Sequence, residues 1–227
     1  CIRDRSFGGT CKAREKNLWH ILPTGYAARD FEVEPDASAA SYFAAAAAIT
    51  GGTVTLDGLC QTSMQGDIKF CEALEQMGCI VTWSSDTASY PFVTIEGRSL
   101  QGIDIDMNAI SDTVMTLAVV ALFAKGPTII RNVEHIRDKE TDRIRDLACE
   151  LQRLGANVEE HPDGLTIHPA SLRPAKIQTY DDHRIAMSLS LAGLRSEGLC
   201  IINPACVGKT FPSYWTEFEN LTKHSRN

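Results

Sequence analysis

Three stretches of this 227-residue sequence repeat the same order of signals, and this repetition limits the folds that the chain can adopt. In each stretch an aspartate precedes an apolar helical run, a glycine follows that run, and a short strand-like segment comes next. The aspartates are Asp36, Asp112 and Asp182, which lie 76 and then 70 residues apart. An acid at a helix start and a glycine just beyond its end are the expected helix caps. Similar signals at this spacing predict several copies of one supersecondary unit.

Each copy continues into a second helix, which starts near Met64, Lys139 or Lys209. In the first two copies this helix is amphipathic, ends in a glycine and runs into a pair of strands. The third copy stops at its second helix. With a strand before each aspartate, the pattern predicts an α+β fold of βαβαββ units at about 32–100, 101–172 and 173–227, the third incomplete. The first helix of the first copy contains five consecutive alanines, 44–48, and should be buried.

The first 31 residues do not fit the repeat and are predicted to be the tail of a preceding unit. Residues 18–21 and 31–34 alternate between apolar and polar types as strands do. Residues 1–16 are rich in charge and glycine, so we expect a ragged terminus there. The initial segment lacks the apolar core of a signal peptide.

Composition excludes several classes of function. A chain with 44% hydrophobic residues can bury a sizeable core, and a net charge of −7 argues against a nucleic-acid partner. No apolar run approaches the roughly 20 residues of a membrane helix.

Eight cysteines lack metal-ligand spacing, and nothing in the sequence indicates a metal or cofactor. Cys71, Cys79 and Cys149 are expected to pack as small apolar side chains in a reducing compartment, the cytoplasm or a plastid-like interior. Lys209 could lower the pKa of Cys206, although no base that would make this thiol a nucleophile can be named.

Three short segments place cations, acids or both near predicted helix starts: 139–143, 181–184 and 208–212. They include two arginines, Arg143 and Arg184, and two lysines, Lys139 and Lys209. Guanidinium forks, lysines and carboxylates can hold a doubly anionic substrate while protons move around it. A solvated, capped helix start explains any one segment equally well. Three such segments at matching places in a repeat favour a functional site.

Several of these segments resemble those of the 5-enolpyruvylshikimate-3-phosphate (EPSP) synthase family. The resemblance extends from about Glu32 to Leu221 and rests on the segments 36–42, 63–67, 131–132, 139–143, 180–187 and 209–212. It implies an enolpyruvyl transferase fold, shared with RNA 3′-phosphate cyclases, in which each of two domains holds three units around a pseudo-threefold axis. Residues 32–227 would be the C-terminal domain. In the family the chain's own N-terminus completes this domain, and the other half of the active site lies outside the present sequence.

The resemblance also implies a reaction and a set of roles. The enolpyruvyl group of phosphoenolpyruvate passes to the 5-hydroxyl of shikimate 3-phosphate, and phosphate leaves. Asp112 resembles the residue that faces the acceptor hydroxyl and takes its proton, and Glu140 the acid beside the phosphoenolpyruvate methylene. Arg143 and Arg184 resemble clamps on phosphoenolpyruvate, and Lys209 the lysine at its phosphate.

Two further positions are expected to contact the acceptor. Lys139 resembles a residue that holds shikimate 3-phosphate, and His135 stands where many family members have an asparagine that touches it. For His183 the expected role is orientation of its neighbours rather than proton transfer. Glyphosate-type inhibitors would bind at the same place.

Two alternatives remain open from the sequence. One is an enolpyruvyl transferase with a UDP-sugar acceptor, and the other is a non-catalytic half-domain. The expected partner is the missing N-terminal half of the enzyme.

Overall fold

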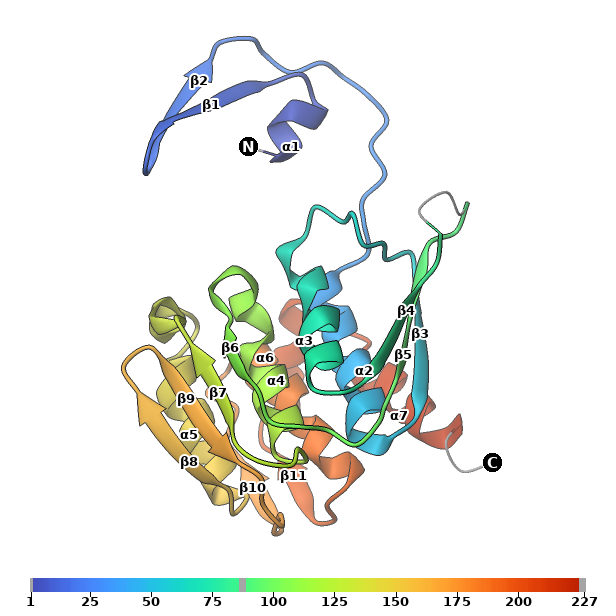
Figure 1. Cartoon of the computed structure of the whole chain (residues 1–227), viewed down its shortest axis with the longest axis vertical. Coiled ribbons are helices and arrows are strands. Elements are labelled where there is room, and N and C mark those ends of the chain that lie inside the picture. Colours follow the sequence, from blue (N-terminus) through green and yellow to red (C-terminus); the bar gives the residue numbers. More distant parts are fainter. Residues whose placement is uncertain (1, 86–88, 225–227) are drawn as a thin grey trace. The chain divides into compact units, whose positions relative to one another are not determined.

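A computed structural model describes residues 2–85 and 89–224 of the chain (Figure 1). Cys1, which was counted among the cysteines, lies outside the described residues. The pattern of contacts separates two compact units, Cys1–Pro35 and Asp36–Asn227.

The first unit consists of helix α1 (Ile2–Ser6) and the antiparallel strands β1 (Thr10–Glu15) and β2 (Leu18–Leu22). The prediction of a ragged terminus over residues 1–16 is therefore wrong. β1 was missed because only Cys11 in it is buried, so the strand has almost no apolar alternation. The predicted strand at 18–21 is confirmed, but residues 31–34 form none. There Phe31 packs against Phe7 instead, with ring centroids 5.2 Å apart.

The second unit contains the repeated elements. Its first helices are α2 (Ala37–Thr50), α4 (Val114–Ala121) and α6 (His183–Ser190), one from each copy. Its second helices are α3 (Phe70–Gln76), α5 (Arg143–Arg153) and α7 (Tyr214–His224). The predicted α+β class with repeated units is confirmed, whereas the boundaries assigned to the three copies stay predictions.

The three first helices pack together through corresponding residues. Alanines 44–48 are all buried, as predicted. One hydroxyl-bearing residue from each helix meets at the centre: Thr116 Oγ1 lies 3.4 Å from Ser41 Oγ and 3.1 Å from Ser188 Oγ. All three side chains are buried. Since buried hydroxyls need partners, these contacts favour one register of the three helices.

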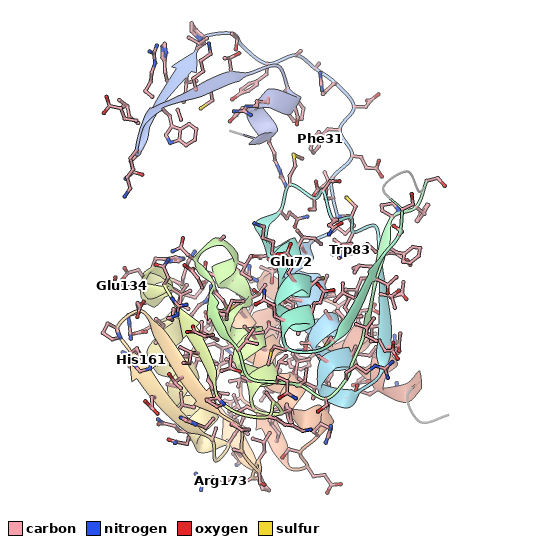
Figure 2. All side chains as sticks on the ribbon, in the orientation of Figure 1. Phe31, Glu72, Trp83, Glu134, His161 and Arg173 are labelled. Atoms are coloured by element: carbon pink, nitrogen blue, oxygen red, sulfur yellow. The ribbon has the colours of Figure 1, made fainter. Side chains whose placement is uncertain are left out.

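The sheets show how complete each copy is. In the first copy β3 (Thr53–Asp57), β5 (Phe92–Glu96) and β4 (Ile80–Trp83) form an antiparallel sheet in the order β3-β5-β4. The second copy has four strands in the order β6-β7-β9-β8: β6 (Asp104–Asp106), β7 (Thr128–Arg131), β9 (Gly164–His168) and β8 (Asn157–His161). These two sheets lie on either side of the central helices in Figure 1. Side chains fill the space between them (Figure 2).

In the third copy, only the parallel strands β10 (Ala175–Ile177) and β11 (Leu199–Ile201) pair within the described chain. They correspond to β6 and β7, so the third copy lacks the antiparallel pair seen in the other two. The expected leading strand is thus present in the second and third copies and absent from the first. The third copy is incomplete, as predicted.

Short 3-10 helices complete the connections. They are η1 (Gly66–Lys69), η2 (Asn108–Thr113), η3 (Glu134–Asp138), η4 (Leu191–Leu194) and η5 (Pro204–Lys209). The second helices therefore begin a few residues later than predicted. In the second copy Asp142 caps α5 by accepting a hydrogen bond from the Arg145 backbone, so residues 139–141 precede the helix.

Two expectations about individual side chains are wrong. Asp112 does not cap α4, because η2 runs past it and Thr113 stands at the cap position. Cys149 is exposed on α5, unlike Cys71 and Cys79, which are buried as expected. Asp36 and Asp182 are true caps: their side chains accept hydrogen bonds from backbone N–H groups of α2 and α6.

Candidate functional site

The charged segments predicted from the sequence meet at the N-terminal ends of α5 and α6. Three cations and three carboxylates from two copies of the repeat form one bonded network, which we call the charge cluster: Arg143, Arg184, Lys209, Asp112, Glu140 and Asp182. Their positive and negative charges are equal in number. The cluster is therefore nearly neutral as a whole when nothing else is bound.

Arg143 is the centre of the charge cluster. It is the first residue of α5, and its side chain is only 2% exposed. Its Nε donates to Asp182 Oδ2 at 2.8 Å, its Nη1 to Asp112 Oδ1 at 3.2 Å and its Nη2 to Glu140 Oε2 at 2.7 Å. Each of its three nitrogens thus meets a different carboxylate. Such saturation holds a buried guanidinium in one orientation.

A strained turn at residues 180–181 precedes Asp182, which accepts a hydrogen bond from Arg143. Tyr180 and Asp181 both have positive φ angles, 53° and 58°, which non-glycine residues rarely adopt. The Tyr180 hydroxyl donates to Glu150 Oε1 at 2.7 Å, and Asn203 Nδ2 donates to Asp181 Oδ1 at 3.1 Å. Asp182 is fully buried, caps α6 and accepts from Arg143. Backbone strain held by side-chain bonds is typical of functional sites.

Asp112 joins the two arginines. Its Oδ2 accepts from Arg184 Nη2 at 2.9 Å, and its Oδ1 accepts from Arg143. The Asp112 side chain is 34% exposed, whereas that of Arg184 is 15% exposed. Because Asp112 is not used as a helix cap, both of its oxygens are available to the cluster. The failure of the capping prediction here thus supports a different role for this carboxylate.

Glu140 joins Arg143 to Lys209. Its Oε1 accepts from Lys209 Nζ at 2.6 Å. Partial burial raises the pKa of Glu140, but the hydrogen bond from Lys209 and the charges of Arg143 and Lys209 prevail and hold this pKa at about 2. Glu140 is therefore ionised at neutral pH while Lys209 is bonded to it. To carry a proton at neutral pH, it would first have to lose those cations to another anion.

Sequence reasoning named the segment 63–67 as a motif but gave its residues no role. In the structure Gln65 Oε1 accepts from the Ala37 backbone at 3.0 Å, and Asp67 accepts from the Ser38 hydroxyl. Burial raises the pKa of Asp67, and its neighbour Asp112 acts in the same direction. A Cβ at Gly66 would lie 2.8 Å from the Ala109 carbonyl oxygen, so glycine permits this close approach of η1 to η2. Asp67 is thus a further acid at the edge of the charge cluster.

The structure does not draw every predicted residue into the network. Lys139 and His135 are exposed and, among the described residues, neither makes a hydrogen bond or ion pair with the charge cluster. His183 is buried, its Nδ1 has no hydrogen-bond partner in the described structure, and burial lowers its pKa. It is therefore neutral at physiological pH and adds no charge to the cluster.

The expectation that a cation lowers the pKa of Cys206 is wrong. Partial burial raises it instead, and Lys209 is bonded to Glu140. Among the described residues no group of three or more metal-ligating side chains is arranged to hold a metal ion. None of the described helices is long and apolar enough to cross a membrane.

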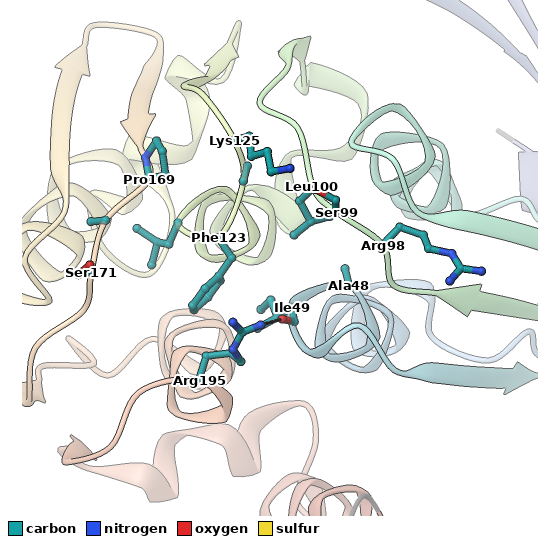
Figure 3. Close-up of a pocket in the computed structure, with 13 residues that line it drawn as sticks. Ala48, Ile49, Arg98, Ser99, Leu100, Phe123, Lys125, Pro169, Ser171 and Arg195 are labelled. Atoms are coloured by element: carbon teal, nitrogen blue, oxygen red, sulfur yellow. Dashed lines mark hydrogen bonds between the residues drawn. The ribbon is translucent and has the colours of Figure 1, made fainter.

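A cavity of about 480 Å³ opens at the opposite ends of the helices (Figure 3). Arg195 is one of the residues that line this cavity. Its Nη1 donates to the Ile49 carbonyl at 2.9 Å, and its guanidinium lies 5.9 Å from the centre of the Phe123 ring. A cation at the C-terminal end of α2 is expected, because the last carbonyls of a helix are electronegative. Arg195 thus has a structural explanation.

The geometry defines a class of protein. Three repeated αβ units bring helix N-termini to one end of the domain, where two arginines and a lysine are paired with three acids. Helix N-termini and guanidinium groups both favour anions. Together with the repeated αβ units, this arrangement agrees with the enolpyruvyl transferase architecture that the sequence predicts.

Comparison with known proteins identifies the family. A family model described as EPSP synthase (3-phosphoshikimate 1-carboxyvinyltransferase) matches residues 5–218, and the chain belongs to this family. A 3-phosphoshikimate 1-carboxyvinyltransferase of Nostoc sp. is 50% identical over 96% of the chain and 51% of its own length. The chloroplastic enzyme of Brassica napus is 51% identical over 85% of the chain and 38% of its own length. The chain thus spans about half the length of the curated relatives it matches, or less.

Solved structures agree on the fold. EPSP synthase from Acinetobacter baumannii superposes with a TM-score of 0.81 at 30% identity, covering 95% of the chain and 52% of that structure. The enolpyruvyl transferase NikO from Streptomyces tendae has a TM-score of 0.69 at 19% identity, covering 96% of the chain and 51% of that structure, which shows the fold alone. The predicted enolpyruvyl transferase architecture is confirmed.

Proposed function

We propose that this chain is the part of an EPSP synthase that carries the proton-transfer groups and half of the anion clamps. The complete enzyme would transfer the enolpyruvyl group of phosphoenolpyruvate to the 5-hydroxyl of shikimate 3-phosphate. The observation that carries this proposal is the charge cluster, in which Asp112 and Glu140 are each bonded to cations that a substrate anion can take over. Both substrates are anionic, so they would compete with these carboxylates for the same donors.

The exchange of partners gives each acid a task. When a phosphate group binds Lys209, Glu140 loses the hydrogen bond from Lys209 Nζ. The pKa of Glu140 then rises from about 2 toward its ordinary value. It can then hold the proton that is delivered to C3 of phosphoenolpyruvate. When an anion takes Arg184, Asp112 keeps only Arg143 and can accept the proton of the acceptor hydroxyl.

The atoms balance over two steps. The acceptor oxygen bonds to C2 of phosphoenolpyruvate while C3 gains a proton, which forms a tetrahedral intermediate. C3 then loses a proton as the bond from C2 to the phosphate oxygen breaks. Arg143 and Arg184 would hold the carboxylate and phosphate of phosphoenolpyruvate, where bidentate contacts suit a guanidinium better than a lysine. Lys139 and His135 are exposed and close to Glu140 in the sequence. Their side chains would bind shikimate 3-phosphate.

The proposed partner of the chain is the N-terminal half of the enzyme. Support comes from the third copy of the repeat, whose sheet lacks the antiparallel pair found in the other two. A cavity of about 520 Å³ with apolar side chains borders β11 and α7, and Leu199, Ile201, Trp215 and Phe218 line it. Added strands would cover these side chains. We further propose a reducing compartment, the cytoplasm, because all seven cysteines in the described residues are free thiols.

Complementation tests this function. The purified chain alone should release no phosphate from phosphoenolpyruvate and shikimate 3-phosphate, and activity should appear when a polypeptide corresponding to the N-terminal half is added. A glyphosate-type phosphonate should inhibit that activity. Turnover with a UDP-sugar acceptor instead would favour the alternative transferase, and no turnover in any mixture would favour a non-catalytic half-domain.

The variant Asp112→Asn separates proton transfer from folding in the same assay. It should lower the rate of the reconstituted enzyme by roughly 10²–10⁴. The melting temperature of the chain should also fall, because Asp112 pairs with two largely buried guanidinium groups, so the rate is compared per folded molecule. A normal rate for Asp112→Asn would contradict its assignment as the proton acceptor.

A further inference from the structure

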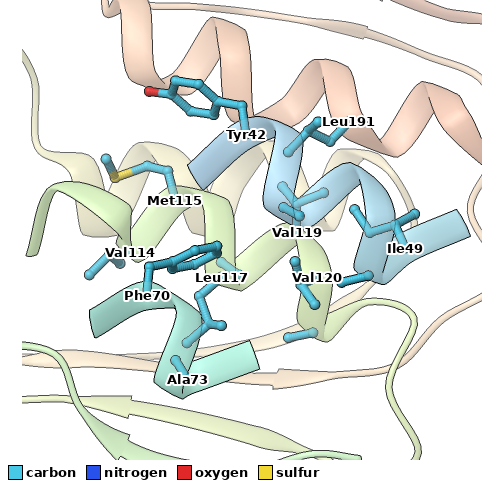
Figure 4. Packing of buried hydrophobic residues seen from close by; sticks show 14 of the residues in the cluster. Tyr42, Ile49, Phe70, Ala73, Val114, Met115, Leu117, Val119, Val120 and Leu191 are labelled. Carbon is cyan, nitrogen blue, oxygen red and sulfur yellow. The ribbon is translucent and has the colours of Figure 1, made fainter. Parts of the chain in front are cut away.

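Glu140 stands on a part of the chain that the hydrophobic core does not hold. Residues 139–142 link η3 to α5, all of them are polar, and none of them is buried. Asp112, by contrast, closely precedes α4, which is buried along its whole length (Figure 4). A loop without apolar packing opens easily unless polar contacts fix it. The position of Glu140 therefore depends on hydrogen bonds at the two ends of its loop.

Arg137, near the end of η3, makes such bonds with every nitrogen of its guanidinium. Its Nε donates to the Pro162 carbonyl at 3.0 Å, and its Nη2 donates to the His161 carbonyl at 2.7 Å. Its Nη1 lies 3.0 Å from both carboxylate oxygens of Asp142 and 2.8 Å from Glu160 Oε1. The Arg137 side chain is only 23% exposed. A largely desolvated guanidinium with this many partners is held in one orientation.

These bonds join three elements around the loop. Arg137 belongs to η3, and Asp142 is the residue that caps α5. His161 ends β8, and Pro162 follows it in the turn that leads to β9. Arg137 therefore closes residues 138–141 into a small loop and fixes both of its ends to the turn between β8 and β9.

Further hydrogen bonds support the same arrangement. The Val133 backbone N–H donates to the Asp163 carbonyl at 2.8 Å, so the start of η3 is held by the same turn between β8 and β9. On the other side of Glu140, the Thr141 hydroxyl donates to the Asp146 carboxylate on α5. The backbone is thus fixed before and after Glu140.

Arg173 provides a comparison at the other end of α5. Its Nε donates to the Arg153 carbonyl at 3.0 Å, and its Nη2 lies 3.4 Å from the Gln152 carbonyl oxygen. Both ends of α5 thus have an arginine that donates to two backbone carbonyls. Only Arg137, however, is bonded to the loop that carries Glu140.

We propose that Arg137 is a positioning residue for Glu140, because it closes the loop that sets the distances from the Glu140 carboxylate to Arg143 and Lys209. The inference rests on the proposed function for the importance of Glu140, but the contacts of Arg137 do not depend on that function. A planar guanidinium can donate to two carbonyls and two carboxylates at once. A lysine ammonium with three donors on a flexible stem cannot reproduce this set of bonds.

The test compares Arg137→Lys with Arg173→Lys in the 227-residue chain. Both variants keep the charge and lose the guanidinium fork, so neither changes the field at Glu140 through a change in net charge. NMR titration of the labelled glutamate carboxyls measures the pKa of Glu140. The rate per folded molecule is measured after a polypeptide corresponding to the N-terminal half is added.

The two variants should differ at Glu140. In Arg137→Lys the carboxylate moves away from Arg143 and Lys209, so its pKa should rise from about 2. We expect its acid dissociation constant to fall roughly tenfold. The reconstituted enzyme should turn over roughly 10–10² times more slowly, the effect of a misplaced reacting group. Arg173→Lys should leave the pKa of Glu140 and the rate unchanged. Both variants should melt at a lower temperature, so the melting temperature does not decide between them.

A milder variant, Glu160→Gln, serves if Arg137→Lys does not fold. Glu160 is 38% exposed, and its loss removes one partner of Arg137. The direct effect of removing a negative charge is to lower the pKa of Glu140, whereas a looser loop raises it. A rise would support the positioning role, and a fall would contradict it.

The failures of the two proposals can be told apart. If the pKa of Glu140 is the same in Arg137→Lys as in the wild-type chain, the role of Arg137 is wrong, whatever the enzyme assay shows. If this pKa rises while the reconstituted enzyme keeps its full rate, Arg137 does position Glu140, and the proposed role of Glu140 in the reaction is wrong. If no mixture turns over, the proposed function fails, and the titration alone decides the role of Arg137.

Discussion

The two ends of the packed first helices both carry arginines, but for different physical reasons. At the C-terminal end Arg195 bonds the Ile49 carbonyl and lies over Phe123. At the N-terminal end Arg143 and Arg184 stand close to helix starts, where the helix dipole favours anions and disfavours cations. The fold therefore explains Arg195 and leaves the other two to be explained by something else.

The carboxylates at the N-terminal end show how the domain tolerates these cations. Asp112, Glu140 and Asp182 neutralise them in the free chain. Asp182 is fully buried, whereas Asp112 and Glu140 have side chains 34% and 26% exposed. One fully buried carboxylate and two partly exposed carboxylates thus exist in one cluster. Under the proposed function, the buried carboxylate builds the site, and a ligand releases the two exposed ones.

The largest expected effect distinguishes the buried arginine of one end from the exposed arginine of the other. Arg143→Ala would leave Asp182 buried without its cation and should cost about 3–5 kcal/mol of unfolding free energy. Arg195→Ala removes one hydrogen bond to a carbonyl and a ring contact, so it should cost about 1 kcal/mol. Urea unfolding measures both variants. Equal losses would mean that Arg143 is no more built into the fold than Arg195 is.

A smaller effect concerns how the unfolding free energy depends on pH through the ion pair between Glu140 and Lys209. Because the pKa of Glu140 is about 2 in the folded chain and about 4.3 when unperturbed, its ionised form stabilises the fold above pH 4.3. This contribution should disappear as the pH falls from about 4.3 to 2. Glu140→Gln should therefore lose less stability than the wild-type chain between pH 5 and 3, by less than about 1 kcal/mol because the pair is partly exposed.

The matched control is Glu219→Gln, which breaks an exposed pair with Lys223 on α7. Its unfolding free energy should depend on pH as that of the wild-type chain does. Should Glu140→Gln behave like this control, Lys209 would not be a strong partner of Glu140 in solution.

Much of the fold could be predicted because the repeat fixes it locally. The helix caps, the left-handed turns and the buried helix are all set by residues close together in the sequence. They are Asp36 and Asp182 for the caps, Gly51, Gly78 and Gly155 for the turns, and alanines 44–48 for the buried helix. Strand β1 was missed because four of its six residues are exposed and it lacks an apolar face. Asp112 was assigned a cap by analogy, but a kinked 3-10 helix precedes α4.

The sequence named residues of the charge cluster but not how they pair, and their roles stay predictions. The sequence named Asp112, Glu140, Arg143, Arg184 and Lys209, and the structure brings all five into one network. It could not show that Arg143 is saturated by three carboxylates, since these bonds join residues as far apart as 143 and 182.

The central claim is that the arginines at the N-terminal end of the helices serve an anion. Calorimetric titration of the 227-residue chain with phosphoenolpyruvate tests it directly, with Arg184→Lys and Arg195→Lys as matched variants. Each keeps the charge and loses the guanidinium fork. We predict that Arg184→Lys weakens binding by roughly 1.5–3 kcal/mol, the range for a hydrogen bond to a charged group, and that Arg195→Lys leaves it unchanged. Equal weakening by both variants, or by neither, would contradict the account.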